Sequence, residues 1–328
     1  MITAPDFHKK QVAVVFFNEG EKLCFTNDNL AVRTAEQKIK FQCSCYRLFI
    51  IYAIGHCSIT SALIEKAQKF GFFIALMTPG FRLYAVIGAA KEANTLLKQK
   101  QYQYNDLGLA VHIVKNKISC QQMMLKRIRY KNENVINAIS KMSFYIQQLD
   151  ECSALQEIIG YEGQAAKMYF KNYFNNINWK GRQPRVKHDI VNATLDIGYT
   201  LLFTFVDALL SAYGFDTYRG VLHRQFYMRK SLVCDIVEPF RTIVDQQVKK
   251  SLNLKQIQEK DFIIINGQYR LRWTVAPKYV EMLMNPILNQ KDRIYEYIQS
   301  YYRSFMKGAP SHCFPIFDMG EGNDYNKL

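Results

Sequence analysis

The hydrophobic pattern of the chain changes near residue 90. Before this point, apolar positions form short, often alternating runs that are separated by polar turns. Alternation with a period of two is typical of half-buried strands. We therefore expect strands at residues 12–17, 22–25, 30–33, 39–41, 47–53, 72–77 and 83–87. Residues 59–70 instead have helical spacing, and Gly71 follows as a helix-ending residue.

After residue 90, apolar positions recur every three or four residues, which predicts helices. The expected helices cover residues 111–131, 135–149, 153–172, 189–213, 231–252 and 278–306. A β-like interruption at 262–273, with Asn266 and Gly267 at its centre, predicts a hairpin. The expected fold class is α+β. It comprises a small β-rich N-terminal domain with one helix (1–95), a linker (96–110) and a larger, mostly α-helical domain (111–328).

Composition narrows the class of protein. The chain has 43 Lys and Arg against 28 Asp and Glu, a net charge of +15, which points to a polyanionic partner and most simply to nucleic acid. A hydrophobic content of 49% excludes a disordered basic tail protein. The longest apolar run, 199–210, contains Asp207 and is too short for a membrane span. The N-terminus has no secretory-signal pattern, so we expect a cytoplasmic protein without a membrane partner.

The eight cysteines do not form a metal-binding or disulfide pattern. They are scattered and include one C-x-C pair but no C-x-x-C pair, which argues against a zinc ribbon or a disulfide framework.

Positive charge is unevenly distributed along the chain. Residues 98–131 hold eight Lys and Arg and one acid, and a second basic set with interleaved aromatics follows between 180 and 230. Such patterns are typical of surfaces that follow a nucleic-acid backbone, although a merely solvated basic face is the alternative. The candidate DNA-binding residues are Lys126, Arg127, Arg129, Arg182, Arg185, Arg224, Arg229, Lys230 and Arg241.

Glu162 is the first candidate for chemistry. It shares a helix face with Ala165 and Tyr169, and a carboxylate on an apolar face is costly unless it is paired or metal-bound. Gly160 and Gly163 flank it and would permit close approach of a bulky group. The structural alternative is a partly buried Glu paired with an Arg.

A second acidic pair follows in the expected helix at 231. Asp235 and Glu238 lie three residues apart, within reach of one cation, and Pro239 should kink the helix beside them. A solvated acidic face is the alternative. His223, a third candidate, precedes this helix, and one imidazole with carboxylates suits Mg²⁺ or Mn²⁺ better than a structural zinc.

These features together favour metal-assisted phosphodiester chemistry on nucleic acid. The sequence has no G-x-x-x-x-G-K-[ST] motif, which argues against a P-loop nucleotide hydrolase, and no H-E-x-x-H motif.

Four motifs in order resemble the CRISPR-associated Cas1 family, the integrase-nuclease of spacer acquisition. They are Tyr161-Glu-Gly163, Asn192-Ala-Thr-Leu-Asp-Ile-Gly-Tyr-Thr-Leu-Leu202, Gly220-Val-Leu-His223 and Ser231-Leu-Val-Cys-Asp-Ile-Val-Glu-Pro-Phe-Arg241. The resemblance covers essentially the whole chain and includes the Ser58-Ile-Thr-Ser61 segment of the β-rich domain.

The resemblance implies a catalytic set of Glu162, His223, Asp235 and Glu238. In the family, a glutamate, a histidine and an acidic residue bind the divalent ion, Mg²⁺ or Mn²⁺, and these positions fall on Glu162, His223 and Glu238. Because the last position is often Asp in the family, whether Asp235 or Glu238 binds the ion directly stays open.

The resemblance also implies the partners and the reaction. A homodimer, formed largely through the β-rich domains, would pair with the small Cas2 protein around double-stranded DNA. The 3′-hydroxyl of a spacer precursor would then attack a phosphodiester at the repeat boundary of a CRISPR array, without a covalent protein intermediate. A non-catalytic DNA-binding scaffold and a metal nuclease of unrelated role are the alternatives.

Overall fold

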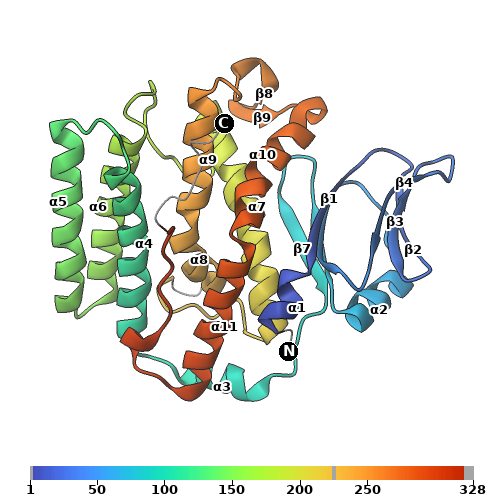
Figure 1. Cartoon of the computed structure of the whole chain (residues 1–328), viewed down its shortest axis with the longest axis horizontal. Helices are drawn as coiled ribbons and strands as arrows, with labels where there is room; N and C mark the ends of the chain where they lie inside the picture. The colour runs from blue at the N-terminus through green and yellow to red at the C-terminus, as the bar shows by residue number, and fades with distance from the viewer. Residues whose placement is uncertain (1–2, 224–226, 321–328) are drawn as a thin grey trace.

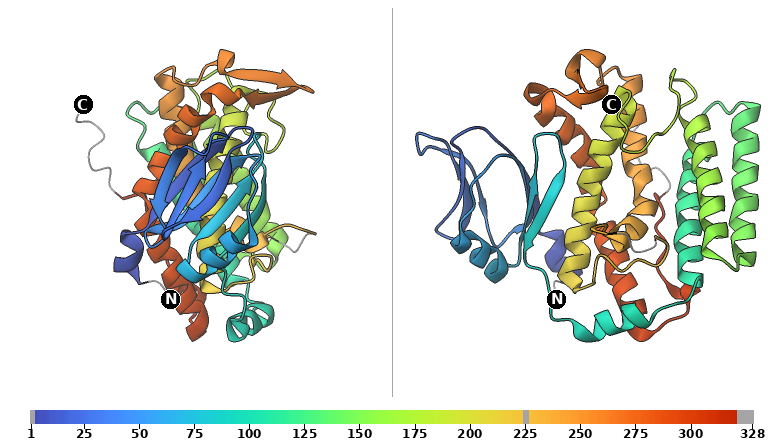
Figure 2. Two further views of the ribbon diagram at one scale, coloured as in Figure 1. Left: turned by 90° about the vertical axis from the view of Figure 1, so that its right-hand side faces the viewer. Right: turned by 180° about the vertical axis from the view of Figure 1, so that it is seen from behind.

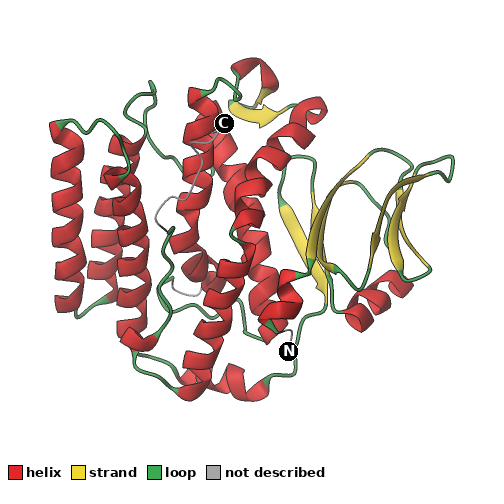
Figure 3. Ribbon diagram, viewed as in Figure 1, coloured by secondary structure: helices red, strands yellow, loops and turns green. Residues whose placement is uncertain are grey.

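Most strands gather at one side of the molecule, and helices with one short hairpin make up the rest (Figure 3). The computed structural model describes residues 3–223 and 227–320. The strand region contains β1 (Gln11–Phe17), β2 (Lys22–Thr26), β3 (Asn29–Arg33), β4 (Ile39–Ser44), β5 (Leu48–Gly55), β6 (Phe73–Met77) and β7 (Leu83–Gly88). The predicted α+β class is confirmed, and each predicted strand lies on an observed one.

Two sheets form the strand region. The larger has the order β1-β5-β6-β7, in which β5 runs parallel to β1 and β6 while β7 is antiparallel; the smaller has the order β2-β3-β4. Every residue of β5 is buried, because the strand has a core on each face. Leu48 and Ile51 pack in the core shared with the smaller sheet, whereas Phe49 and Tyr52 belong to the core of the helical region.

The strand region is joined firmly to the helices. The Tyr52 hydroxyl donates to the backbone carbonyl of Leu201, a helical residue, over 2.9 Å. The short helix α2 (Ser61–Phe70) packs on the strands, begins where the Thr60 side chain accepts from the Leu63 amide, and ends at Gly71 with a φ of 74°. The predicted helix and its glycine cap are confirmed.

The helical region contains the predicted helices and the hairpin (Figure 1). Its elements are α1 (Ala4–His8), α3 (Thr95–Gln103), α4 (Gly108–Lys126), α5 (Glu133–Gln148), α6 (Leu155–Tyr173), α7 (Ile190–Tyr213), α8 (Ser231–Val237), α9 (Arg241–Asn253), β8 (Phe262–Ile265), β9 (Gln268–Leu271), α10 (Ala276–Asn289) and α11 (Lys291–Lys307), with short 3₁₀ turns η1 (Leu149–Glu151), η2 (Glu238–Phe240), η3 (Glu259–Asp261), η4 (Trp273–Val275) and η5 (Ser311–Cys313).

Several boundaries differ from the expected ones. The helix expected at 111–131 begins at Gly108 and ends at Lys126. The segment 96–110, expected to be a linker, holds most of α3 and the start of α4. The helix expected at 278–306 is two helices, because Gln290 leaves the helical conformation with φ −105° and ψ 6°. Apolar periodicity continues across this junction, so the pattern alone did not reveal it.

Helix α7 is the core of the helical region. Within the described part of the chain it alone is long and apolar enough to cross a membrane, but 83% of its most apolar window is buried inside the protein, as in a core helix. Gly198 lies where α9 crosses: a Cβ there would come within 2.5 Å of a Val244 methyl. Only glycine permits this helix spacing without displacement.

Candidate active site

A buried lysine joins two of the predicted carboxylates. Helix α4 packs against α6 and the η2 turn, and it carries Lys117 between Glu162 of α6 and Glu238 of η2. The Lys117 ammonium forms an ion pair with Glu162 Oε1 and lies 2.6 Å from Glu238 Oε2. Arg241 Nε lies 3.1 Å from the same Glu238 oxygen. Carboxylates from two separate segments therefore meet at one cationic position.

The charges of this cluster stabilise one another out of water. The side chains of Lys117 and Glu238 are 8% and 5% exposed, whereas that of Glu162 is 24% exposed. Burial opposes the charged form of Glu238, but the positive charges of Arg241 and Lys117 outweigh it and lower the pKa of this carboxyl. Burial likewise opposes the Lys117 ammonium, yet the carboxylates of Glu238 and Glu162 raise the pKa of Lys117 above its ordinary value. These directions of the pKa favour the charged forms of both Lys117 and Glu238.

The predicted break at Pro239 directs Glu238 into the cluster. Helix α8 ends at Val237, and residues 238–240 form a 3₁₀ turn before α9 begins at Arg241. Proline lacks the amide hydrogen that would continue the α-helical ladder. The expected helix 231–252 is therefore interrupted beside its acids, as predicted.

Asp235 points to different partners. Its carboxylate accepts from the backbone amides of Val221, Leu222 and His223 at 2.6, 3.0 and 2.9 Å. Burial raises its pKa to about 8, against the lowering effect of these amides. Gly220 packs on the carboxylate, because a Cβ there would come within 2.6 Å of Asp235 Oδ2. Asp235 thus fixes the loop that carries His223, and the solvated acidic face that the sequence left open does not occur.

The same carboxylate orients His223. The imidazole Nδ1 lies 2.6 Å from Asp235 Oδ1, and its side chain is 30% exposed. Because both oxygens of Asp235 already accept backbone amides, we assign the proton to Nδ1. This leaves the lone pair on Nε2, the arrangement that a carboxylate gives to metal-binding histidines.

The structure assembles the predicted catalytic residues as two pairs. Glu162 and Glu238 converge, and so do His223 and Asp235; Glu238 is near enough to Asp235 to raise the pKa of the latter, although burial is the larger cause. No three His, Cys, Asp or Glu side chains of the described residues form a group arranged to hold a metal ion. The carboxylate pair of Glu162 and Glu238 has converging oxygen donors, the ligand type that Mg²⁺ or Mn²⁺ prefers.

The two predicted glycines leave space beside Glu162. A Cβ added to Gly160 or Gly163 would meet nothing within 4 Å, and both residues are exposed on α6. No close packing among the described residues requires these glycines, so the helix surface next to the carboxylate is open to approach from outside.

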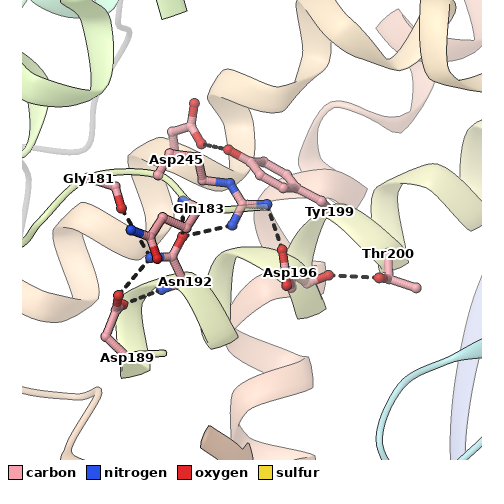
Figure 4. Close-up of polar contacts among 9 residues, drawn as sticks. Gly181, Gln183, Asp189, Asn192, Asp196, Tyr199, Thr200 and Asp245 are labelled. Carbon is pink, nitrogen blue, oxygen red and sulfur yellow. Dashed lines mark hydrogen bonds and ion pairs between the residues drawn. The ribbon is translucent and has the colours of Figure 1, made fainter. Parts of the chain in front are cut away.

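A buried set of tyrosines and one aspartate packs against Arg241 and holds it in place. Its guanidinium lies 4.7 Å from the centre of the Tyr199 ring, and the Tyr199 hydroxyl donates to Asp245 (Figure 4). Tyr169, on the same helix as Glu162, donates to the other oxygen of Asp245 over 3.1 Å. Burial raises the pKa of Asp245 to about 6, even though the two hydroxyls favour its charged form. These contacts fix Arg241 against Glu238.

The candidate DNA-binding residues divide by environment. Three form ion pairs inside the protein: Arg182 with Asp196, Lys230 with Asp207, and Arg241 with Glu238. Arg127 donates to the backbone carbonyl of Gly320, and Arg229 is half-buried. The exposed ones are Lys126, Arg129 and Arg185, and Arg224 lies outside the described residues.

Lys117 is the residue of this site that the sequence reasoning did not single out. It was counted only within the basic run at 98–131. Its position offered a signal, because it lies four residues after Ile113 and four before Gln121, all of them buried on one face of α4. A lysine on a buried helix face requires a carboxylate partner.

The family model and the similar curated protein that match this chain carry the same family name. The model of the family described as CRISPR associated protein Cas1 matches residues 14–284. The "CRISPR-associated endonuclease Cas1 1" of Francisella tularensis subsp. novicida (strain U112) is 29% identical over 277 residues, which is 80% of this chain and 86% of that relative.

Solved structures share the fold. A chain of a "Cas6-RT-Cas1--Cas2 complex" superposes with a TM-score of 0.81 at 20% identity, covering 95% of this chain and 36% of that longer chain. A "Casposase bound to integration product" superposes with a TM-score of 0.78 at 19% identity and covers 97% of both chains. At these identities the likeness concerns the fold alone.

Proposed function

Because the chain belongs to the CRISPR-associated Cas1 family, we propose that it is a divalent-metal-dependent DNA endonuclease and integrase of CRISPR adaptation. It would join the 3′-hydroxyl of a spacer precursor to a phosphodiester at the boundary of a CRISPR repeat. The observation that supports this most strongly is the convergence of Glu162 and Glu238 on one cationic position. The endonuclease name of the Francisella relative and the integration product bound to the casposase agree with this class of reaction.

The donor set fits Mg²⁺ or Mn²⁺ at the carboxylate pair. Glu162 Oε1 and Glu238 Oε2 both contact the Lys117 ammonium, so one cation already satisfies both oxygens. His223, with Nδ1 held by Asp235, would present Nε2 as a further ligand. When bound, the ion supplies Lewis-acid polarisation of a phosphoryl oxygen. We assign Glu162, His223 and Glu238 to the ion, and Asp235 to positioning His223.

The other residues of the cluster hold these groups in place. Arg241, fixed by its contacts with Tyr199 and Glu238, keeps the Glu238 carboxylate ionised and oriented. The open surface at Gly160 and Gly163 would admit the DNA backbone beside Glu162. Preorganised charge of this kind, in a site with little water, is worth more than the same charge in solvent.

We further propose the partners that this function requires. The net charge of +15 favours double-stranded DNA, both as spacer precursor and as repeat array. The presence of Cas2 in the solved Cas6-RT-Cas1--Cas2 complex supports Cas2 as partner in an integration complex. A homodimer formed through the β-rich region, acting in the prokaryotic cytoplasm, completes the proposal.

One observation favours a second candidate function. Glu162 and Glu238 are both satisfied by Lys117, as they would be in a non-catalytic DNA-binding scaffold whose acids only form ion pairs. The two candidates differ in their need for a divalent ion, because a scaffold binds DNA equally well in EDTA and Mn²⁺ and changes no phosphodiester bond.

A plasmid assay tests the proposal. Wild-type protein should nick and join supercoiled DNA with Mn²⁺ and should be inactive in EDTA. Glu162→Ala should lose this activity while its circular dichroism spectrum is unchanged. Glu281→Ala, at an exposed position on α10, is the matched control and should retain activity. Full activity of Glu162→Ala, or activity of the wild type in EDTA, would overturn the proposal.

A further inference from the structure

The β8–β9 hairpin and the loop between α6 and α7 form one continuous surface. The Tyr269 amide of β9 donates to the carbonyl of Lys187 over 2.8 Å, and His188 Nδ1 lies 3.4 Å from the carbonyl of Gly267. The loop therefore pairs with the outer edge of the hairpin. The hairpin stands at one end of the helical region (Figure 1) and projects from it in side view (Figure 2).

The loop is anchored at its base by Arg182. The guanidinium donates to Asn192 Oδ1 over 2.9 Å and to Asp196 Oδ1 over 2.6 Å, both on α7 (Figure 4). Asn192 also accepts from the Gln183 amide and donates to the Gly181 carbonyl. Arg182 is thus a structural anchor, and the loop that follows it is held in one conformation.

Beyond this anchor the loop carries two basic residues in an unusual backbone conformation. Arg185 and Lys187 have φ values of +67° and +52°, a left-handed conformation that such side chains rarely adopt. Arg185 is exposed and Lys187 is half-buried. A conformation of this cost persists only where the surrounding structure enforces it.

Basic residues gather around the hairpin without acidic partners. We call Arg185, Lys187, Lys260, Arg270 and Arg272 the basic hairpin surface; Arg272 Nε donates to the Lys260 carbonyl over 3.0 Å. None of the five forms an ion pair with a carboxylate of residues 3–223 or 227–320.

The acids of the same segment are satisfied internally. Glu259 accepts from the Tyr269 hydroxyl over 2.9 Å, and Asp261 accepts from the Tyr279 hydroxyl over 2.7 Å. Both carboxylates keep their negative charge, but the five residues of the basic hairpin surface outnumber these two acids. The segment therefore carries a net positive charge, which fits an anionic partner.

The shape of the hairpin matches a duplex. A two-stranded β-ribbon has the width of the major groove of DNA. At the tip, Ile264 is 62% exposed, and Arg270 lies opposite Ile263 in the strand register. A projecting ribbon flanked by arginines and lysines can lie along a groove while its charges contact the backbone phosphates on either side.

This surface is also connected to the carboxylate cluster. The Arg182 guanidinium lies 5.2 Å from the centre of the Tyr199 ring, and Arg241, the partner of Glu238, lies 4.7 Å from the same ring. One aromatic ring separates the base of the loop from the candidate active site. We propose that the basic hairpin surface binds the backbone of duplex DNA that flanks the reacting phosphate, an inference that rests on the proposed function.

A salt-dependence experiment tests this contact. The affinity of a fluorescent DNA duplex is measured by anisotropy in EDTA, over a series of NaCl concentrations, for wild type and Arg185→Glu/Arg270→Glu. The plot of log affinity against log salt has a negative slope, and each lost phosphate contact reduces its steepness by about 0.9. Loss of two contacts should therefore make the slope shallower by about 1.8. If the reversed charges disturb folding, the neutral pair Arg185→Gln/Arg270→Gln replaces them and should show the same change of slope.

The control carries the same charge change elsewhere. Lys141→Glu/Lys307→Glu alters two exposed lysines of α5 and α11, outside the basic hairpin surface, and should keep the wild-type slope. A hairpin variant with an unchanged slope, or a control with an equal loss, would overturn the inference. If either result is found while the wild-type protein still joins DNA in Mn²⁺, the inference about the hairpin is rejected and the proposed function is kept. If the slope changes as expected but the wild-type protein never joins DNA, the proposed function is rejected and the inference about DNA contact is kept.

Discussion

Removing the Lys117 ammonium should lower the stability of the protein, because the carboxylates of Glu162 and Glu238 then lose the cation that they share. In Lys117→Met, the carboxylates of Glu162 and Glu238 stay close together, and Arg241 is the one cation of residues 3–223 and 227–320 that still contacts one of them. Breaking a buried ion pair by removing one partner costs about 3–5 kcal/mol. Because Arg241 remains beside Glu238 and Glu162 is partly exposed, we expect a loss of about 3 kcal/mol, at the lower end of that range.

Urea unfolding in EDTA, followed by circular dichroism, measures this loss. The matched control is Lys115→Met, two residues away on α4, where the ammonium pairs with Asp150 and the Asp150 side chain is 62% exposed. A surface pair of this kind contributes about 1 kcal/mol or less. The double variant Lys117→Met/Glu162→Gln should recover part of the stability, because one of the two uncompensated charges is then gone.

A divalent ion should replace the missing charge. Adding Mn²⁺ is expected to stabilise Lys117→Met more than wild type, since the carboxylate pair of the variant has lost its internal cation. Equal stability of Lys117→Met and Lys115→Met in EDTA would refute the charge balance that we infer. Equal stabilisation of Lys117→Met and wild type by Mn²⁺ would refute the assignment of the ion to this pair.

Three further perturbations test separate parts of the site. In joining assays across a Mn²⁺ titration, Glu238→Gln should remove nearly all activity. Because Asp235 acts through His223, Asp235→Asn should lower the activity by only about 10- to 100-fold, and excess Mn²⁺ should restore part of it. The opposite result for the two variants would exchange the two roles. Gly163→Ala should raise stability in urea by about 0.5–1 kcal/mol, because its Cβ meets open space and alanine favours the helix. Because burial raises the pKa of Asp245 from 3.8 to about 6, the folded protein binds this proton more tightly than the unfolded chain does. The free energy of unfolding of the wild type should therefore fall relative to that of Asp245→Asn as pH rises from about 4 to about 6. A difference between the two proteins that does not change with pH in that window would contradict the raised pKa.

Strands and helices could be predicted from the sequence, because each depends on the spacing of apolar residues within one short segment. Periodic apolar positions located the strands and helices, and Pro239 correctly predicted the interruption that directs Glu238 inward. The division of one expected helix at Gln290 was missed, since apolar residues continue on both sides of it.

Contacts between distant segments were beyond the reach of local pattern. Asp235 and Glu238 were expected to lie near one shared cation, but the structure gives them different partners: the His223 loop for one and Lys117 for the other. Spacing along one helix cannot determine which neighbouring segment each side chain meets. The anchoring role of Arg182 was likewise invisible, because its partners Asn192 and Asp196 come from the following helix.

Transfer of a labelled strand through its 3′ end tests the central claim most directly. A duplex labelled at its 5′ end, with either a 3′-hydroxyl or a 3′-deoxy terminus, is incubated with the protein, the proposed partner Cas2, Mn²⁺ and a plasmid that carries a CRISPR repeat. We predict that label enters the plasmid only from the 3′-hydroxyl duplex, and that Glu162→Ala abolishes the transfer. Plasmid cleavage without transfer of label, or equal transfer from the 3′-deoxy duplex, would contradict the proposed integrase.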